Sequence, residues 1–292
     1  MQEVVNGFRR VSDEFPQRLL IGEIYLPFER LVAYYGRNLA GVHLPFNFAL
    51  LHAHWDAVTI AALIDAYEAA LPAGGWPNWV LGNHDRARIA SRVGEAQARV
   101  AAMLLLTLRG TPTLYYGDEI GMRQVPIPPD RVRDPFEKRV PGIGVGRDGA
   151  RTPMQWDTGP FAGFSTVEPW LPIADCHQSR NVEMELRDPF SIQHLYRRLL
   201  ATRRRYRALS EGSYRRLLTQ PDILLYARQA GSECILIALN FESKATSTLL
   251  PSGAASGVVL VSSFGDRERE HIEGRINLRA NEGVVIGPVA LR

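Results

Sequence analysis

Three short apolar segments of the sequence each end in a glycine that is followed within three residues by a carboxylate. The polar groups after these segments are Glu23, the run Asn83, His84 and Asp85, and the pair Asp118 and Glu119. Carboxylates can donate or accept protons, and an imidazole beside them adds a further hydrogen-bonding group. Because the pattern occurs three times, it predicts one acidic site shared by several strand ends, which is a catalytic arrangement more than a packing one.

The elements that position these groups are predicted to be parallel strands and helices. Apolar runs of this length are typical of buried parallel strands, whose C-terminal ends carry the chemistry in β/α barrels. Strand-like and helix-like segments alternate over the first two hundred residues, which predicts an α/β fold with a parallel sheet wrapped by helices. The expected strands cover residues 18–25, 42–48, 78–82 and 112–116, and the expected helices cover residues 3–14, 28–36, 57–70 and 95–109.

A long connection rich in Pro and Gly, residues 118–188, follows the fourth strand, and its length indicates an ordered lid. A helix over residues 189–206 closes this part of the chain. Short alternating runs then predict an antiparallel β-sandwich. Its expected strands cover residues 223–227, 234–240, 245–250, 258–262, 275–278 and 283–286. We therefore expect two domains, a barrel-like domain over 1–210 and a β-sandwich domain over 211–292.

The composition is that of an ordinary globular chain, with 46% hydrophobic and 22% charged residues among 292. The formal net charge of +3 is small for this length, and basic residues are interspersed with acidic ones, so we expect no nucleic-acid partner. The one dense basic cluster, residues 203–207, continues a helical pattern. We interpret it as a solvated helix face.

No membrane segment, metal site or cofactor site is predicted. The longest strongly apolar stretch, residues 100–108, is shorter than the roughly 20 residues that span a bilayer and is expected to be a core helix. Residues 1–15 are amphipathic and do not resemble a signal peptide. Cys176 and Cys234 match no metal-binding spacing, and we interpret them as unpaired thiols of a cytoplasmic protein. Phosphate-loop and dinucleotide signatures are absent from the sequence.

Four motifs, taken in order, resemble the alpha-amylase superfamily of glycoside hydrolases, and within it the alpha-glucosidase and oligo-1,6-glucosidase type. They are residues 21–26, 81–86, 110–121 and 146–157. The resemblance covers essentially the whole chain and equates its four strands with the fifth to eighth strands of the family's barrel. It implies the C-terminal half of a (β/α)8 TIM-type barrel followed by an all-β antiparallel sandwich domain, and an oligosaccharide substrate.

The resemblance also implies residue roles. Glu23 is similar to the general acid and base, Asp85 to the carboxylate that stabilises the transition state, and His84 to a donor for sugar hydroxyls. From the residues alone, Glu23 could instead pair with an arginine at a strand end, and His84 with Asp85 could form a polar plug. We keep both interpretations open.

Three further residues resemble substrate-binding positions of the family. They are Asn83, Arg88 and Arg147. Arg88 could equally form a surface salt bridge. Asp118 and Glu119 are expected to be structural and to bond the backbone of their own loop.

The family's nucleophilic aspartate belongs to the fourth strand, which this sequence lacks. Asp13 lies in a similar context, but Val11 stands where the motif needs an acid and the segment is helical. We therefore expect no significant activity from the chain alone. Two alternatives are a noncatalytic sugar-binding or interaction module, and one half of a split enzyme. Because half a barrel exposes sheet edges, we expect an N-terminal half-barrel partner or a homodimer.

Overall fold

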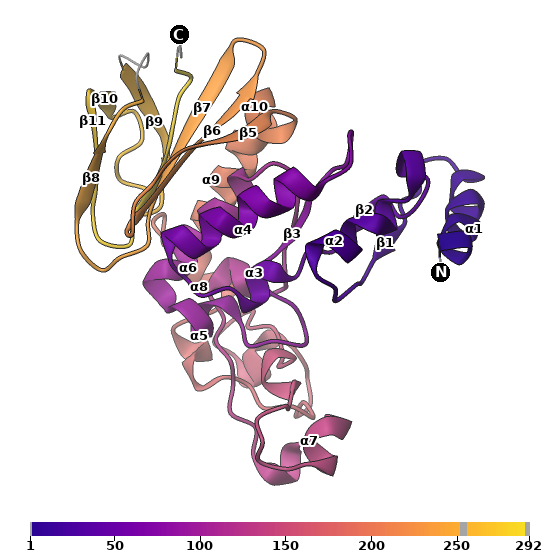
Figure 1. Ribbon diagram of the computed structural model, residues 1–292. Coiled ribbons are helices and arrows are strands. Elements are labelled where there is room, and N and C mark those ends of the chain that lie inside the picture. The colour runs from indigo at the N-terminus through magenta and orange to yellow at the C-terminus, as the bar shows by residue number, and fades with distance from the viewer. Residues whose placement is uncertain (1, 252–255, 290–292) are drawn as a thin grey trace.

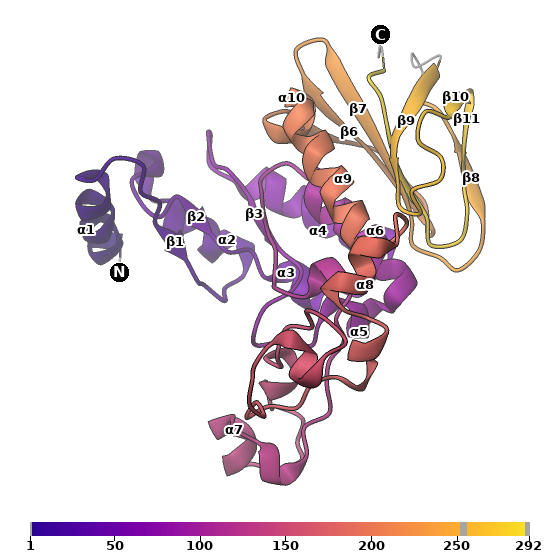
Figure 2. The ribbon, with the colours of Figure 1, turned by 180° about the vertical axis from the view of Figure 1, so that it is seen from behind.

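The computed structural model of the chain describes residues 2–251 and 256–289. Figure 1 shows a row of short strands with its helices, a lid around α7 (Pro135–Arg139) that extends away from them, and layered β-sheets near the C-terminus. Seen from behind, α9 (Ile192–Arg205) lies between the strand row and the layered sheets (Figure 2). The barrel-like part and the C-terminal sheets are thus packed together through helices.

Four short parallel strands form the N-terminal sheet, in the order β1 (Ile21–Gly22), β2 (Leu44–Pro45), β3 (Asn78–Val80) and β4 (Thr111–Thr113). A parallel bridge between Asn47 and Trp79 joins β2 to β3, so the order in space follows the chain. This is the predicted α/β arrangement. All four hydrogen-bonded strands are shorter than predicted, and Ile21 in β1 and Leu114 just after β4 remain exposed.

Four helices around this sheet begin and end near their predicted positions, and two short ones, over residues 49–52 and 89–93, lie outside the predicted ones. They are α1 (Gln2–Asp13), α2 (Phe28–Leu31) with the following 3-10 turns at Val32–Tyr35 and Arg37–Leu39, α3 (Ala49–His52), α4 (Ala57–Ala70), α5 (Ile89–Val93) and α6 (Glu95–Thr107). The Asp56 side chain accepts a hydrogen bond from the Thr59 amide and so caps the start of α4. Every residue from Val100 to Thr107 is buried, which confirms the predicted core helix.

Asp13 lies on the surface of α1, where it pairs with Arg9 at 2.9 Å one helical turn away. The interpretation of Asp13 as a helix-surface acid is confirmed. An exposed pair of this kind stabilises a helix by about 0.2–0.5 kcal/mol.

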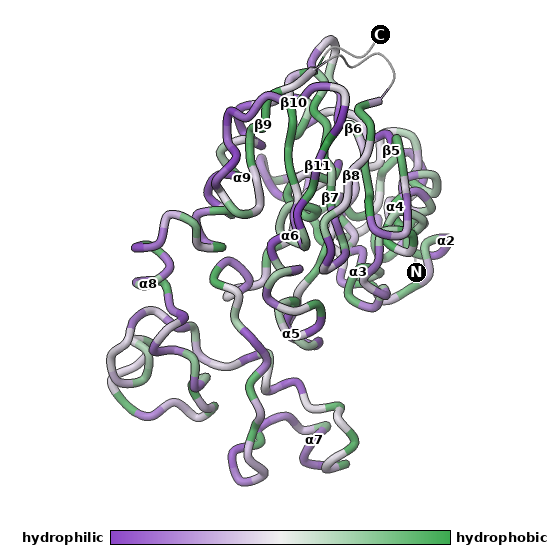
Figure 3. Tube along the Cα trace, turned by 90° about the vertical axis from the view of Figure 1, so that its left-hand side faces the viewer, coloured by the Kyte–Doolittle hydropathy of each residue, from purple (hydrophilic) through white to green (hydrophobic). Residues whose placement is uncertain are grey.

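The lid contains only short helices, which its Pro and Gly content explains. They are the 3-10 turns Asp118–Ile120, Pro129–Arg131, Asp148–Ala150, Pro160–Gly163 and Asp175–Gln178, together with α7 and α8 (Val182–Arg187). Figure 3 shows that hydrophilic residues prevail along much of the lid, whereas the strands of the C-terminal sheet contain long hydrophobic stretches. Hydrogen bonds rather than a large apolar core therefore hold the lid in shape.

The C-terminal part is an antiparallel sandwich, as predicted. Its strands are β5 (Ser213–Thr219), β6 (Ile223–Ala230), β7 (Glu233–Asn240), β8 (Thr246–Leu249), β9 (Ser256–Ser262), β10 (His271–Glu273), β11 (Arg275–Leu278) and β12 (Gly283–Ile286), preceded by α10 (Arg207–Ser210). Six of them form one sheet in the order β10-β9-β12-β7-β6-β5, and β11 pairs with β8. Residues such as Leu236 and Ile276 fill the space between them. The sequence pattern missed β5, which is only partly buried, and the three-residue β10.

The barrel-like part and the sandwich share one apolar core. A continuous cluster of buried side chains runs from Trp79 and Leu104 to Tyr226 and Val285. The fully buried Arg228 donates hydrogen bonds to backbone carbonyls on both sides of the junction, those of Thr107, Gly212 and Ser213. A division into domains at residue 210 therefore remains a proposal based on sequence texture.

One sequence interpretation needs correction at this junction. Arg203, expected on a solvated helix face, points inward and donates hydrogen bonds to the carbonyls of Leu106, Leu108 and Gly110. The last carbonyl groups of α6 have no amide donor within the helix, so a cation at this end donates hydrogen bonds to them and offsets the negative end of the helix dipole.

We expect Gly82→Ala to destabilise the fold. A Cβ atom at Gly82 would lie 2.5 Å from Oδ2 of the buried Asp118, so the strand end and the carboxylate would have to move apart. Such overpacking costs about 1–3 kcal/mol of unfolding free energy, which urea denaturation measures. Gly7→Ala on α1 is the matched control, because no atom lies within 4 Å of its Cβ position and alanine favours helix. Equal stabilities of the two variants would contradict this expectation.

Candidate active site

The strand ends bring Glu23, His84 and Asp85 together. Glu23 follows β1, and His84 and Asp85 follow β3. A carboxylate oxygen of each acid and a ring nitrogen of His84 all lie within 4.8 Å of one another. Glu23 and His84 are exposed, and Asp85 is partly buried. Two of the three acidic segments thus meet at one place, as the repeated sequence pattern predicted.

Two lid arginines hold the carboxylate of Asp85. Its Oδ1 atom accepts a hydrogen bond from Nη2 of Arg151 at 2.9 Å and one from Nη1 of Arg147 at 3.3 Å. Nε2 of His84 lies 3.3 Å from the same oxygen. Charge-assisted bonds of this kind fix the orientation of a carboxylate more strongly than neutral hydrogen bonds. The lid therefore determines where Asp85 points.

Arg147 is itself anchored by Asp134. The carboxylate of Asp134 is inaccessible to solvent and accepts hydrogen bonds from Nε of Arg147 at 2.8 Å and from Nη2 at 2.9 Å. It also accepts from the backbone amides of Phe136 and Arg147. The hydrogen bonds from Arg147 hold the pKa of Asp134 well below its usual range, and the same contact raises the pKa of Arg147. The pair therefore stays charged at neutral pH.

Asn83 lies beneath the site and contacts its neighbours. It is buried, its Nδ2 atom donates to the Tyr25 hydroxyl at 2.9 Å, and its Oδ1 atom accepts from the Asp85 amide at 3.1 Å. Tyr25 in turn stacks on Phe48, with ring centres 4.2 Å apart. The structure thus gives Asn83 a positioning contact to two site residues.

Arg88 does not reach the surface that Asp85 faces, which corrects both sequence-based expectations for it. Its side chain is completely buried, and Nη1 donates to the Tyr116 carbonyl at 2.6 Å. The guanidinium carbon lies 4.6 Å from the centre of the Tyr116 ring. A group without solvent contact forms neither a surface salt bridge nor a contact to a ligand in the pocket. Arg88 instead supports the loop after β4 from below.

Asp118 belongs to the interior of this loop. It is buried, its amide donates to the Tyr115 carbonyl, and burial raises the pKa of its carboxyl group to about 7 although Arg88 and Arg92 act in the opposite direction. This supports the structural interpretation of Asp118.

Among the described residues, Glu23, His84 and Asp85 are the side chains of metal-binding type that lie close enough together to share an ion. Both lid arginines donate to Asp85, and their positive charges oppose a cation at this place. The arrangement instead suits a ligand with many hydroxyl groups, which carboxylates and guanidinium groups can bind by hydrogen bonds.

Sequence reasoning missed several residues of the site. Arg151 is covered only by the fourth motif, residues 146–157, and no sequence pattern singles out Asp134, Phe136, His52 or Arg86. A local signal exists for Asp134, because an Asp before Pro135 is typical of a helix start, and its side chain does cap α7. That signal does not reveal that the same carboxylate binds Arg147.

A parallel β/α sheet with carboxylates after two of its strands, joined to an antiparallel sandwich, is the architecture of part of a β/α-barrel protein. Residues 1–212 match the family described as "Alpha amylase, catalytic domain". The chain therefore belongs to the alpha-amylase family, and its fold is the C-terminal half of a (β/α)8 barrel followed by an antiparallel β domain.

Similar curated proteins are named as glucosidases. A probable alpha-glucosidase of Rhizobium meliloti (strain 1021) is 34% identical over 85% of this chain and 47% of its own length. Maltase A1 of Drosophila melanogaster is 34% identical over 82% and 44%. An oligo-1,6-glucosidase of Parageobacillus thermoglucosidasius is 31% identical over 79% and 46%. The chain spans about half the length of these relatives.

Solved structures of similar fold also extend well beyond the part that this chain matches. The alpha-glucosyl transfer enzyme XgtA is 28% identical, with a TM-score of 0.89 over 99% of this chain and 54% of that one. The trehalulose synthase MutB of Pseudomonas mesoacidophila MX-45 is 26% identical, with a TM-score of 0.88 over 98% and 58%. Within residues 2–251 and 256–289, no helix has the length and apolarity needed to cross a membrane.

We expect Asp134→Asn to loosen the lid. The substitution removes the charge that pairs with Arg147, and hydrogen bonds between charged groups contribute about 1.5–3 kcal/mol each. Amide hydrogen exchange at Phe136 and Arg147 should accelerate about tenfold or more, as measured by mass spectrometry or NMR. The matched control is Asp130→Asn, because Asp130 is an exposed lid acid for which the described residues offer no side-chain partner. Equal exchange in the two variants would refute the anchoring role of Asp134.

We expect the contribution of Asp118 to the free energy of unfolding to decrease as pH rises from about 4 to above 7. In this interval the folded chain retains a proton on Asp118 that the unfolded chain has lost. The folded pKa of about 7 exceeds the ordinary value of 3.8, so the folded state binds more protons in this interval and loses stability with increasing pH. One such group contributes a slope of at most ~1.4 kcal/mol per pH unit. Urea denaturation at pH 5 and pH 8 should show a smaller pH effect in Asp118→Asn than in the parent chain. An unchanged or steeper pH effect would contradict the raised pKa.

Proposed function

We propose that this chain supplies the general acid and the transition-state stabiliser of a retaining alpha-glucosidase that acts on short gluco-oligosaccharides. The observation that carries this proposal is the approach of Glu23 and Asp85 to within 4.8 Å at the ends of β1 and β3. Membership of the alpha-amylase family and the names of the curated relatives support the substrate class.

In the proposed reaction, Glu23 protonates the departing glycosidic oxygen and later accepts a proton from the attacking water. Asp85 remains ionised and stabilises the positive charge that develops on the sugar ring. The exposed His84 donates a hydrogen bond to a sugar hydroxyl. Arg147 keeps the Asp85 carboxylate in place, and Asn83 holds the backbone amide of Asp85 from below. Arg88 takes no direct part.

A retaining mechanism also needs a carboxylate nucleophile. Glu23 and Asp85 already have other roles, and Asp13 is paired with Arg9 on a helix surface. We propose that the nucleophile comes from an N-terminal half-barrel, on the same polypeptide or on a separate one. The chain by itself is then inactive.

An exposed apolar face supports completion of the barrel by another half. Val4, Phe8, Val11 and Phe15 follow one another at helical spacing, and each is exposed by more than half. Leu19 and Ile21, just before and within β1, are also exposed, by 64% and 48%. An apolar strip beside an unpaired strand edge is a liability in water unless another element covers it. A second copy of the chain is the alternative cover, and sedimentation of the chain alone distinguishes a dimer from a monomer.

We expect a chimaera that joins the N-terminal half of the Rhizobium meliloti relative to residue 1 of this chain to hydrolyse p-nitrophenyl alpha-D-glucoside, whereas the chain alone does not. Glu23→Gln should lower kcat of the chimaera about 10²- to 10⁴-fold, because the general acid is lost. Asp85→Asn should also lower it strongly, because an amide does not offset developing positive charge.

The matched control is Glu29→Gln. Glu29 is exposed, and among the described residues its side chain forms neither a hydrogen bond nor an ion pair. Hydrolysis by the chain alone, or a folded chimaera whose activity survives Glu23→Gln, would disprove the proposed roles. Binding of maltose or isomaltose to the chain alone, measured by calorimetry without turnover in the chimaera, would favour a noncatalytic sugar-binding module.

We also propose a cytoplasmic location. The support is limited to chemistry: Cys176 and Cys234 are free thiols, and Cys234 is buried. Free thiols persist where the environment is reducing.

A further inference from the structure

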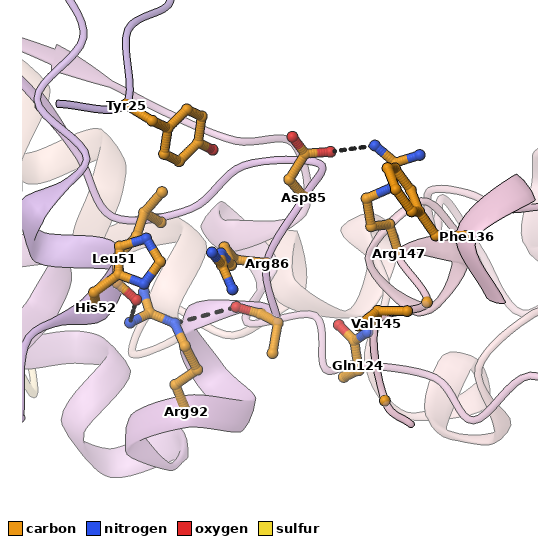
Figure 4. Close-up of a pocket in the computed structure, with 13 residues that line it drawn as sticks. Tyr25, Leu51, His52, Asp85, Arg86, Arg92, Gln124, Phe136, Val145 and Arg147 are labelled. Carbon is orange, nitrogen blue, oxygen red and sulfur yellow. Dashed lines mark hydrogen bonds and ion pairs between the residues drawn. The ribbon is translucent and has the colours of Figure 1, made fainter. Parts of the chain in front are cut away.

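A pocket of about 740 Å³ lies beside Asp85, on the side of Tyr25 and His52 (Figure 4). Its opposite wall is formed by Phe136 and Val145 of the lid. Tyr25 and Phe136 are 45% and 59% exposed, so both present aromatic surface to a bound molecule. All of these residues belong to this chain, and the pocket therefore exists before any partner completes the barrel.

Arg86 lines this pocket directly after Asp85 in the chain. In Figure 4 its guanidinium group lies between His52 on one side and Asp85 with Arg147 on the other. Arg86 is exposed. Within the described residues its side chain forms no hydrogen bond, and no carboxylate lies within 4 Å of it.

The other charged groups of the lining already have partners. Arg147 is bound by Asp134, and Arg92 donates hydrogen bonds to the carbonyls of Leu51 and Leu81. One oxygen of Asp85 accepts hydrogen bonds from both Arg147 and Arg151, so its negative charge is already paired with two arginines of the lid. Among the described residues, Arg86 is thus the exposed cation of the lining whose side chain has neither an ion pair nor a hydrogen bond.

His52 lies in the same positive environment. Its pKa is lowered by burial and by the positive charges of Arg86 and Arg92. A second cation is therefore unfavourable in this part of the pocket, and an anion is favourable.

We propose that this pocket binds the leaving-group or acceptor part of the substrate and that Arg86 selects molecules carrying a phosphate or carboxylate group there. A guanidinium group can bind two oxygens of such a group at once, which gives specificity as well as affinity. Tyr25 and Phe136 would flank the sugar ring or another organic portion. The assignment of this pocket to the leaving group or acceptor rests on the proposed function, whereas the selection of anionic molecules by Arg86 does not.

Binding to the chain can be measured by calorimetry with D-glucose 6-phosphate, D-glucuronate, D-glucose and inorganic phosphate. At least one of the two anionic sugars should bind about tenfold or more tightly than glucose. Tighter binding of the phosphorylated sugar assigns phosphate as the preferred group, and tighter binding of glucuronate assigns carboxylate. Inorganic phosphate should bind more weakly than the preferred sugar, because it lacks the part that contacts the aromatic walls.

Arg86→Gln should abolish the preference for anionic over neutral sugar, and Arg204→Gln is the matched control. Arg204 is exposed and, within the described ranges, has no side-chain partner, so its loss tests for a nonspecific effect of charge. The imidazole NMR signals of His52 should shift when the anionic sugar binds to the parent chain and to the control, but not in Arg86→Gln. An anion preference that survives Arg86→Gln would overturn the proposal, as would equal or undetectable binding of all sugars.

Failure of the proposed function would leave a different signature. Glu23→Gln should not change anion binding, because Glu23 does not line this pocket. An inactive chimaera whose anion preference still depends on Arg86 would contradict the glucosidase assignment alone. An active chimaera without that dependence would contradict the role of Arg86 alone.

Discussion

The ion pairs of Asp85 with Arg147 and Arg151 join the end of β3 to the lid. Without them, the lid would meet the strand ends only through scattered hydrogen bonds, since its own apolar core is small. Asp134 fixes one of these pairs because it holds Arg147 from the solvent-inaccessible side. The same contacts that orient the Asp85 carboxylate thus also define one wall of the neighbouring pocket.

Below the site, the sheet depends on packing that reaches far along the chain. α6 is buried between the parallel strands and the C-terminal sheet, and Arg203 and Arg228 bind carbonyls at its end. Backbone acceptors at a buried helix end need donors, and two arginines from later parts of the chain provide them. The position of the site on β3 is therefore tied to residues more than one hundred positions away.

The sequence was sufficient for features that depend on local pattern. The helix predicted over residues 57–70 has the bounds of α4, and the order of the four parallel strands is the one that the resemblance to a barrel implied. The meeting of Glu23 with Asp85 follows from the rule that parallel strands end at the same edge of a sheet. The orientation of long cationic side chains could not be predicted in the same way. Arg88 and Arg203 are flexible and polar, and they point inward only because backbone carbonyls distant in sequence lie there.

The two edges of the parallel sheet differ in how firmly they are held. β4 lies next to β3, whose Trp79 belongs to the large shared core, whereas α1 beside β1 buries only Val5 and is attached through Arg9 to the carbonyls of Leu39 and Gly41. A second half that closes the barrel would consequently meet one preformed margin and one adaptable margin. Because Glu23 follows β1, the less firmly held margin carries one of the two acids of the site, whereas Asp85 follows β3 in the more firmly packed part of the sheet.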